Sequence, residues 1–191
     1  MDERSERDSD DDLMLAYAQG DADAFNRLYA RYRGPLYRYL MHATGQSAVA
    51  DDLFQDVWSR IINARLTFQR KTGFKRWAFR IAHNRLVDHW RSNPTRDSNA
   101  EHALERLSAD ARSQPEAERL REERADQLQR ALMALPAEQR EAFLLQQEAG
   151  LSLNEIAGRF GTGRETIKSR LRYAVNKLRQ RLGDTSETVK P

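Results

Sequence analysis

The sequence contains no cysteine, which rules out disulfides, thiol nucleophiles and cysteine-based zinc sites. Glycine and proline are scarce, with 9 and 5 among 191 residues, and the β-branched runs typical of strands are almost absent. No apolar run approaches the ~20 residues of a membrane span, and the start, MDERSERDSDDD, lacks the basic and then apolar pattern of a secretion leader. These absences predict an all-α, cytoplasmic protein without membrane insertion.

Charge is abundant and unevenly distributed. The net charge is +3, but residues 1–12 hold seven acids against two arginines. Between residues 60 and 91 nine Lys or Arg accompany a single acid, and between residues 164 and 181 seven accompany one. Two separate basic segments favour a polyanion contacted at two places. For either segment alone, an ordinary solvated helix face is the alternative.

Apolar periodicity predicts a helical first domain over residues 13–92, after a disordered acidic stretch at 1–12. We expect a short helix ending near Gly20, a second capped by Asp21, and an interruption at Gly34-Pro35. Further helices are expected over residues 48–64, where Leu53, Val57 and Ile61 lie one turn apart, and over residues 74–91.

A polar segment, residues 93–123, separates this domain from a second one. Large apolar residues almost vanish there while Pro, Ser, Asn, Asp and Glu accumulate, which predicts a flexible linker. Periodicity then resumes, and we expect a helical domain over residues 124–183 followed by a disordered tail at 184–191.

The second domain contains two short amphipathic stretches separated by Gly-Thr-Gly. Ser152 and Glu155 have the spacing of a capping box, and Thr162 and Glu165 repeat it. This pattern predicts a helix-turn-helix whose second helix enters the DNA major groove, with a plain charged hairpin as the alternative. The residues expected to contact duplex DNA are Arg164, Glu165, Thr166, Lys168, Ser169, Arg170 and Arg172.

Two stretches closely resemble a bacterial RNA polymerase sigma factor of the extracytoplasmic-function group. LSLNEIAGRFGTGRETIKSRLRYAVNKLR, preceded by ALPAEQREAFLL, is similar to region four, which binds the upstream promoter element. ADDLFQDVWSRI followed by FKRWAFRIAHNRLVDHWR is similar to region two, which docks on polymerase and opens the downstream element. The resemblance covers nearly the whole chain. At the turn, Gly161 to Arg164 departs from the family pattern, which implies a looser turn and weaker upstream binding.

The resemblance implies the partners and their residues. Core polymerase would bind through the clamp helices of its largest subunit and the flap of the second-largest. Contacts to the clamp helices are expected from Asp51, Asp52, Gln55, Asp56, Trp58 and Arg60. The loop over residues 65–73 would capture a flipped base and the next helix would hold the single strand, through Phe68, Arg70, Lys71, Lys75, Arg76, Trp77, Arg80 and Asn84. Among these we expect Phe68 to stack on a base and Trp77 to pack in the core.

No catalytic residue, metal site or cofactor is predicted, because the four histidines show no ligand pattern and no phosphate-binding loop is present. The resemblance further implies an anti-sigma protein as inhibitor and a monomer when free. A second hypothesis is that residues 1–12 fold back onto the basic surface of region two. The alternative function is a conventional helix-turn-helix regulator with an N-terminal sensing domain.

Overall fold

The computed structural model describes residues 9–92 and 116–183, which form helices joined by short turns, with no strand among them. They belong to two compact units, the first made by residues 9–41 with 47–92 and the second by residues 42–46 with 116–183. The predicted all-α fold with two small domains is confirmed. The expected tail and most of the expected linker lie outside the described residues.

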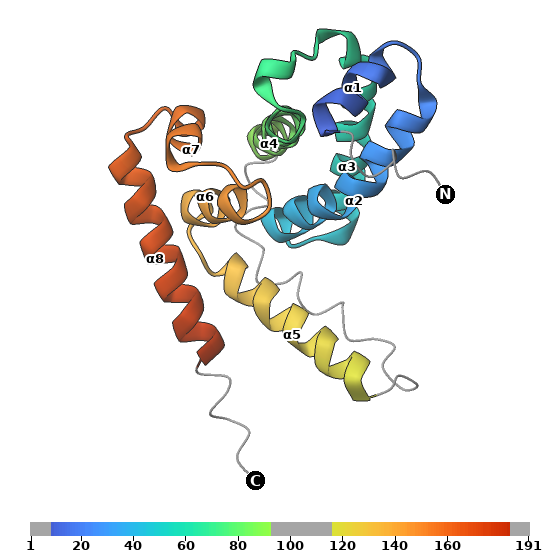
Figure 1. Cartoon of the computed structure of the whole chain (residues 1–191). Helices are drawn as coiled ribbons and strands as arrows, with labels where there is room; N and C mark the ends of the chain where they lie inside the picture. The colour runs from blue at the N-terminus through green and yellow to red at the C-terminus, as the bar shows by residue number, and fades with distance from the viewer. Residues whose placement is uncertain (1–8, 93–115, 184–191) are drawn as a thin grey trace. The chain divides into compact units, whose positions relative to one another are not determined.

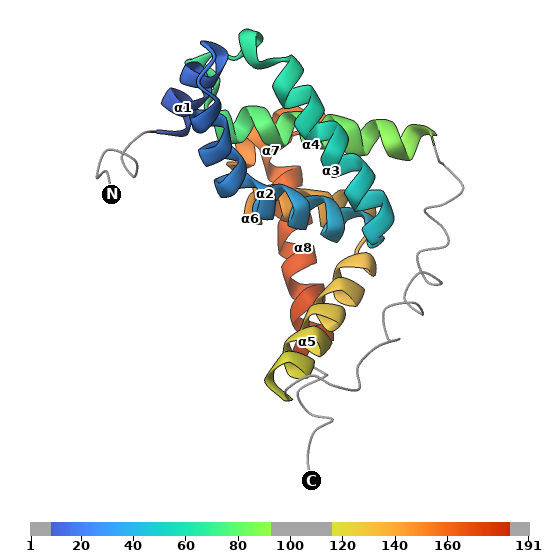
Figure 2. The same ribbon diagram turned by 90° about the vertical axis from the view of Figure 1, so that its right-hand side faces the viewer.

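Four helices and two 3-10 turns make up the first unit (Figure 1). The helices are α1 (Asp10–Ala18), α2 (Ala22–Thr44), α3 (Ser47–Asn63) and α4 (Phe74–Ser92), and the turns η1 (Arg65–Thr67) and η2 (Arg70–Thr72) connect α3 to α4. The predicted stripe of Leu53, Val57 and Ile61 is buried, at 2% exposure or less. It packs α3 against α4, and α4 begins beside α1 (Figure 2).

Helix α2 runs without a break through Pro35, so the predicted interruption at Gly34-Pro35 is wrong. Proline inside a helix costs ~3 kcal/mol because it removes a backbone hydrogen bond. Leu36, Tyr39 and Leu40 directly after it are completely buried. Burying each contributes ~2 kcal/mol, and together they offset that cost. The predicted cap at Asp21 is confirmed, since its Oδ1 accepts hydrogen bonds from two amides in the first turn of α2.

Helix α1 starts earlier than predicted. It begins at Asp10, with the Ser9 side chain accepting a hydrogen bond from the Asp12 amide. The expectation of disorder through residue 12 is therefore wrong for residues 10–12, while residues 1–8 lie outside the described residues. Acids in the first turn of a helix are favourable because they face its positive end.

The second unit contains α5 (Glu116–Met133), α6 (Ala137–Gln147), α7 (Leu153–Phe160) and α8 (Arg164–Gly183). Helix α8 packs on α6, α7 and α5 through Ile167, Leu171, Ala174 and Leu178, which are buried. Helix α5 includes residues 116–123, which we expected to belong to the linker. We expected a linker because this stretch has few apolar residues. It is rich in Glu, Arg and Ala, however, and these residues favour a helix even where no apolar stripe is present.

Candidate functional site

The helix-turn-helix is built from α7, a tight turn and α8. The predicted capping box is confirmed: the Ser152 Oγ accepts from the Glu155 amide, and the Glu155 Oε2 accepts from the Ser152 amide at 2.9 Å. Gly161 ends α7 in the left-handed region, at φ 59°, which glycine adopts without strain. The second predicted box is wrong, because α8 begins at Arg164 and Gly163, not Thr162, precedes it.

Most of the predicted duplex contacts lie on the exposed side of α8. Arg164, Glu165, Thr166, Lys168 and Arg172 are exposed, and Ser169 is partly exposed. The Glu165 carboxylate lies 3.4 Å from both the Arg164 and the Lys168 side chains, so it links two cations along the helix. Arg172 lies over the ring of Tyr173, which is itself exposed. This surface is cationic and rich in hydrogen-bond donors.

Arg170 is placed differently. Its side chain is only 20% exposed, forms an ion pair with Glu138 of α6, and lies 5.2 Å from the centre of the Phe160 ring in α7. It therefore connects three helices of the second unit.

The predicted polymerase contacts on α3 separate into two groups. Asp51, Asp52, Gln55 and Arg60 are exposed, whereas Trp58 is buried at 5% exposure. Asp56 forms an ion pair with Arg85 of α4 and lies 3.5 Å from Arg60. Helix α3 therefore presents two exposed aspartates at one end, while its third, Asp56, is paired with α4.

A row of aromatic side chains lies beside these acids. We call Phe25, Tyr29, Tyr37, Phe54 and Trp58 the aromatic ladder, because neighbouring rings are 4.8 to 6.4 Å apart. All but Trp58 are partly exposed. Burial raises the pKa of Tyr37, and its hydrogen bond with Asp51 raises it further. The same hydrogen bond connects the aromatic ladder to the exposed acids of α3. Phe25 and Tyr29 are not among the predicted contacts, although their spacing of four residues places them on one helix face.

The loop between α3 and α4 packs inward, contrary to expectation. Phe68 is 6% exposed and its ring lies 5.4 Å from Trp77 and 6.3 Å from Phe74. The prediction of an exposed, stacking Phe68 is therefore wrong, because the two 3-10 turns direct this ring into the core. Trp77 is buried as predicted. The exposed apolar residue of this loop is Leu66, at 73%.

Most of the predicted strand contacts are exposed, and one of them lines a cavity. Five of the predicted strand contacts are exposed, namely Arg70, Lys71, Lys75, Arg76 and Arg80. Asn84 is also exposed, and it lines a cavity of about 400 Å³ together with Arg60, Asn63, Ala64 and Ile81. Ile81 supplies an apolar wall, and two side-chain amides and a guanidinium supply hydrogen-bonding groups. Asn63 and Ile81 were missed because the cavity forms between two helices.

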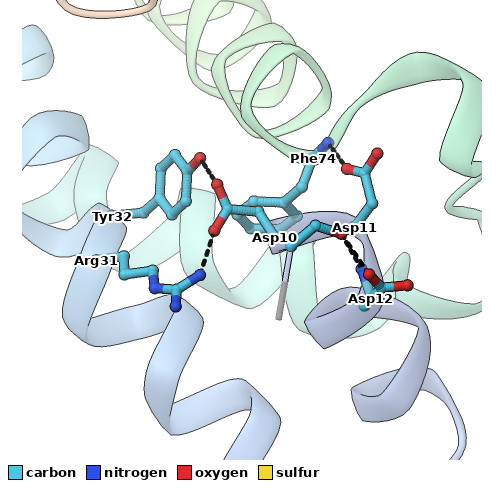
Figure 3. A network of polar contacts seen from close by, with 7 residues as sticks. Asp10, Asp11, Asp12, Arg31, Tyr32 and Phe74 are labelled. Carbon is cyan, nitrogen blue, oxygen red and sulfur yellow. Dashed lines mark hydrogen bonds and ion pairs between the residues drawn. The ribbon is translucent and has the colours of Figure 1, made fainter. Parts of the chain in front are cut away.

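The acidic start of α1 contacts three other elements, and Figure 3 shows the contacts with α2 and α4. Asp10 binds Arg31 of α2 at 2.8 Å and accepts a hydrogen bond from the Tyr32 hydroxyl. Asp11 Oδ1 accepts a hydrogen bond from the Phe74 amide at 2.5 Å. Asp12 forms an ion pair with Arg70, which agrees with the fold-back hypothesis for this residue. The remaining residues of that hypothesis, 2–8, lie outside the described residues.

These contacts affect protonation. Burial, followed by the hydrogen bond to Asp10, raises the pKa of Tyr32 well above its ordinary value. The hydrogen bond from Ser9, together with Arg70, lowers the pKa of Asp12. Both effects favour the charge states in which the contacts hold.

Two kinds of site find no support among residues 9–92 and 116–183. No group of three or more His, Asp or Glu side chains is arranged to hold a metal ion there. No helix in the same ranges is long and apolar enough to cross a membrane.

Comparison with known proteins matches both units. The family description Sigma-70 region 2 matches residues 28–95 and Sigma-70 region 4 matches residues 131–180. The chain is 32% identical to the ECF RNA polymerase sigma factor SigM of Mycobacterium tuberculosis over 94% of its own length and 87% of that protein.

Two solved structures have a similar fold. CnrH, determined in complex with the cytosolic domain of CnrY, is 25% identical, with a TM-score of 0.64 over 93% of this chain and 99% of that one. The sigma factor RpoE of Bartonella quintana, determined with the anti-sigma factor NepR, shares the fold at 22% identity, with a TM-score of 0.63 over 83% of this chain and 96% of that one. The chain therefore belongs to the extracytoplasmic-function (ECF) RNA polymerase sigma factors, which direct RNA polymerase to promoters.

Proposed function

We propose that the two units divide promoter recognition between them. The first unit docks on core polymerase through α3 and takes the opened downstream strand at the loop over residues 65–73 and at α4. The second unit reads the upstream duplex with α8. The observation that carries this proposal is a cavity lined by Arg60, Asn63 and Asn84 in the unit that also carries exposed cations, together with a cationic helix-turn-helix in the other.

Docking on polymerase is assigned to the exposed acids Asp51 and Asp52, with Gln55, and to the aromatic ladder beside them. Exposed carboxylates attract a basic surface, and partly exposed rings supply apolar contact area. This combination suits the clamp helices of the largest subunit if they present basic and apolar side chains. Asp56 holds the docking helix in place through its ion pair with Arg85, and Trp58 does so by packing in the core. A second contact joins the flap of the other large subunit to the second unit.

The cavity beside Asn84 is proposed to hold one unstacked base. A volume of about 400 Å³ lies in the range of small-ligand pockets. The Asn84 amide has both donors and an acceptor, so it can distinguish base edges. Arg60 adds a guanidinium to its lining, and Lys75, Arg76 and Arg80 neutralise phosphates along α4. Ile81, in place of the buried Phe68, provides the apolar surface against the base.

On the duplex side, Arg164, Glu165 and Arg172 are proposed to read base edges, and Lys168 to bind phosphate. Arg170 is assigned a supporting role because Glu138 and Phe160 already engage its side chain.

Regulation and location follow from the relatives. CnrH was solved with the cytosolic domain of CnrY, and the Bartonella protein with an anti-sigma factor. We propose that an anti-sigma protein likewise covers the docking surface of this chain, that the free chain is monomeric, and that it works in the cytoplasm with RNA polymerase. It catalyses no bond chemistry itself. The alternative, a regulator with a sensing domain, is disfavoured because residues 28–95 match region 2.

The test is transcription by purified core polymerase from fragmented genomic DNA of the source organism, with and without this protein, with start sites mapped. We expect new start sites that share an upstream and a downstream element. An absence of added start sites, together with no co-purification with core, would overturn the proposal.

A further inference from the structure

Asp11 differs from its two acidic neighbours because its partner is a backbone amide of another helix. Its carboxylate accepts a hydrogen bond from the amide of Phe74, the first residue of α4, at 2.5 Å. The two residues are 63 positions apart in the sequence. Figure 3 shows the carboxylate of Asp11 pointing at this amide, while Asp10 points at α2.

The start of α4 needs an acceptor from elsewhere. The first amides of a helix have no partner within it, and a polar side chain just before the helix usually supplies one. Here that position is Gly73, at φ 75°, which has no side chain to offer. Phe74 is 1% exposed, so the surroundings of its amide are largely closed to water. Asp11 therefore does for α4 what a local capping residue does elsewhere, and its negative charge faces the positive end of the helix.

The capped junction lies in the middle of the predicted single-strand site. Arg70 and Lys71 precede the Phe74 amide by three or four residues, and Lys75 and Arg76 follow it directly. The directions in which these cations point depend on how η2 passes into α4 at Gly73. We propose that Asp11 is a positioning residue for single-strand binding, which caps α4 from α1 and so holds the loop cations in register with the cavity beside Asn84. This inference rests on the proposed function of the first unit, and α1 lies before the stretch that matches region 2.

Asp12, the next residue, has the opposite effect on DNA. Its ion pair with Arg70 is exposed, with 45% and 60% of the two side chains accessible. A phosphate that binds Arg70 has to displace the Asp12 carboxylate, so Asp12 competes with DNA while Asp11 prepares the site. Asp10 provides a matched control, because it carries the same charge in the same turn and binds α2.

The experiment uses the full chain bound to core polymerase and a labelled single-stranded oligonucleotide with the non-template sequence of the downstream element. The dissociation constant is measured over a range of salt concentrations for the wild type and for four variants. Asp11→Ala removes the acceptor, whereas Asp11→Asn keeps an acceptor oxygen and removes the charge. Asp12→Asn releases Arg70, and Asp10→Asn is the control.

We expect Asp11→Ala to weaken binding about tenfold, the factor that corresponds to loss of one charged hydrogen bond, and Asp11→Asn to stay within about threefold of wild type. Asp12→Asn should tighten binding about threefold and steepen the salt dependence by ~0.7, as one added phosphate contact predicts. Asp10→Asn should change binding by less than about twofold, since its contacts lie outside the loop. Hydrogen exchange should show faster exchange of the Phe74 amide in Asp11→Ala alone.

The outcomes separate the two proposals. If wild-type holoenzyme binds the oligonucleotide no better than core polymerase does, the proposed function of the first unit is overturned, and this inference with it. If the wild type binds and Asp11→Ala binds equally well, only the role of Asp11 is overturned. Equal weakening by Asp11→Ala and Asp11→Asn would show that charge alone acts, which contradicts the capping role. Unchanged core binding by Asp11→Ala, together with unchanged exchange in α3, shows that the unit remains folded.

Discussion

Asp56 of α3 and Arg85 of α4 form an ion pair that joins the proposed polymerase-docking helix to the proposed strand-binding helix. Both side chains are partly exposed, at 38% and 23%, so solvent weakens the pair without abolishing it. Asp51 and Asp52, which precede it on α3, are exposed instead. Acids close together in sequence therefore differ in what they contact.

Asp56→Ala is expected to lower the free energy of unfolding of the first unit by about 1 kcal/mol, because the ion pair with Arg85 is lost. The effect is modest because water partly screens this pair in the wild type. Asp52→Ala should change it by less than about 0.5 kcal/mol, yet weaken binding to core polymerase. Urea unfolding and co-sedimentation with core measure the two effects. A stability loss at Asp52 equal to that at Asp56 would contradict the assignment.

Asn84→Ala is expected to slow promoter opening about tenfold and to relax the base preference at one position of the downstream element, because the side chain that reads the base edge is removed. Lys75→Ala is the matched control on the same helix. It should weaken binding evenly over all sequences and reduce the salt dependence by ~0.7. Permanganate reactivity of opened promoters, compared over base-substituted templates, makes the measurement. If both variants lost the base preference at that position, or if both kept it, the result would contradict the binding of a base in this cavity.

Arg170 and Arg172 lie two residues apart on α8 and should behave differently. Arg170→Ala is expected to destabilise the second unit by about 1–2 kcal/mol, since it loses the contacts with Glu138 and Phe160. Arg172→Ala should leave stability within about 0.5 kcal/mol and weaken upstream duplex binding by about 1–3 kcal/mol. Thermal unfolding of each variant measures the structural role, and titration with duplex DNA measures the contribution to DNA binding. The opposite pattern would reverse the two roles.

Tyr32 is expected to make the first unit sensitive to alkaline pH. Its pKa is raised in the folded chain, so above the ordinary tyrosine value of about 10 the folded state retains a proton that the unfolded state has lost. The free energy of unfolding must therefore fall as pH rises above about 10. Tyr32→Phe should be less stable at neutral pH by about 1 kcal/mol, because it loses the bond to Asp10, and should show a smaller alkaline fall. Urea unfolding over a pH series tests this, and parallel curves would refute it.

Interactions within a few residues were predictable from the sequence. The stripe of Leu53, Val57 and Ile61, the cap at Asp21 and the capping box of Ser152 with Glu155 all depend on spacings of two to four residues, which helix geometry makes neighbours. The charge segregation similarly indicated two basic surfaces. Where local signals failed, as at Pro35, burial of the following residues outweighed the local preference.

The contacts that arrange the proposed sites depended on the tertiary structure. Phe68 looked like an exposed ring in a polar loop until two 3-10 turns placed it against Trp77, and the cavity of Asn84 exists only where α3 and α4 meet. Asp11 reaches Phe74 across 63 residues, a separation at which no periodic pattern carries information. The sequence by itself determined most of the helical segments and which helix faces are apolar, because these properties arise between neighbours along the chain. Which acid meets which cation was decided by packing, because only the folded core brings distant helices within hydrogen-bond reach.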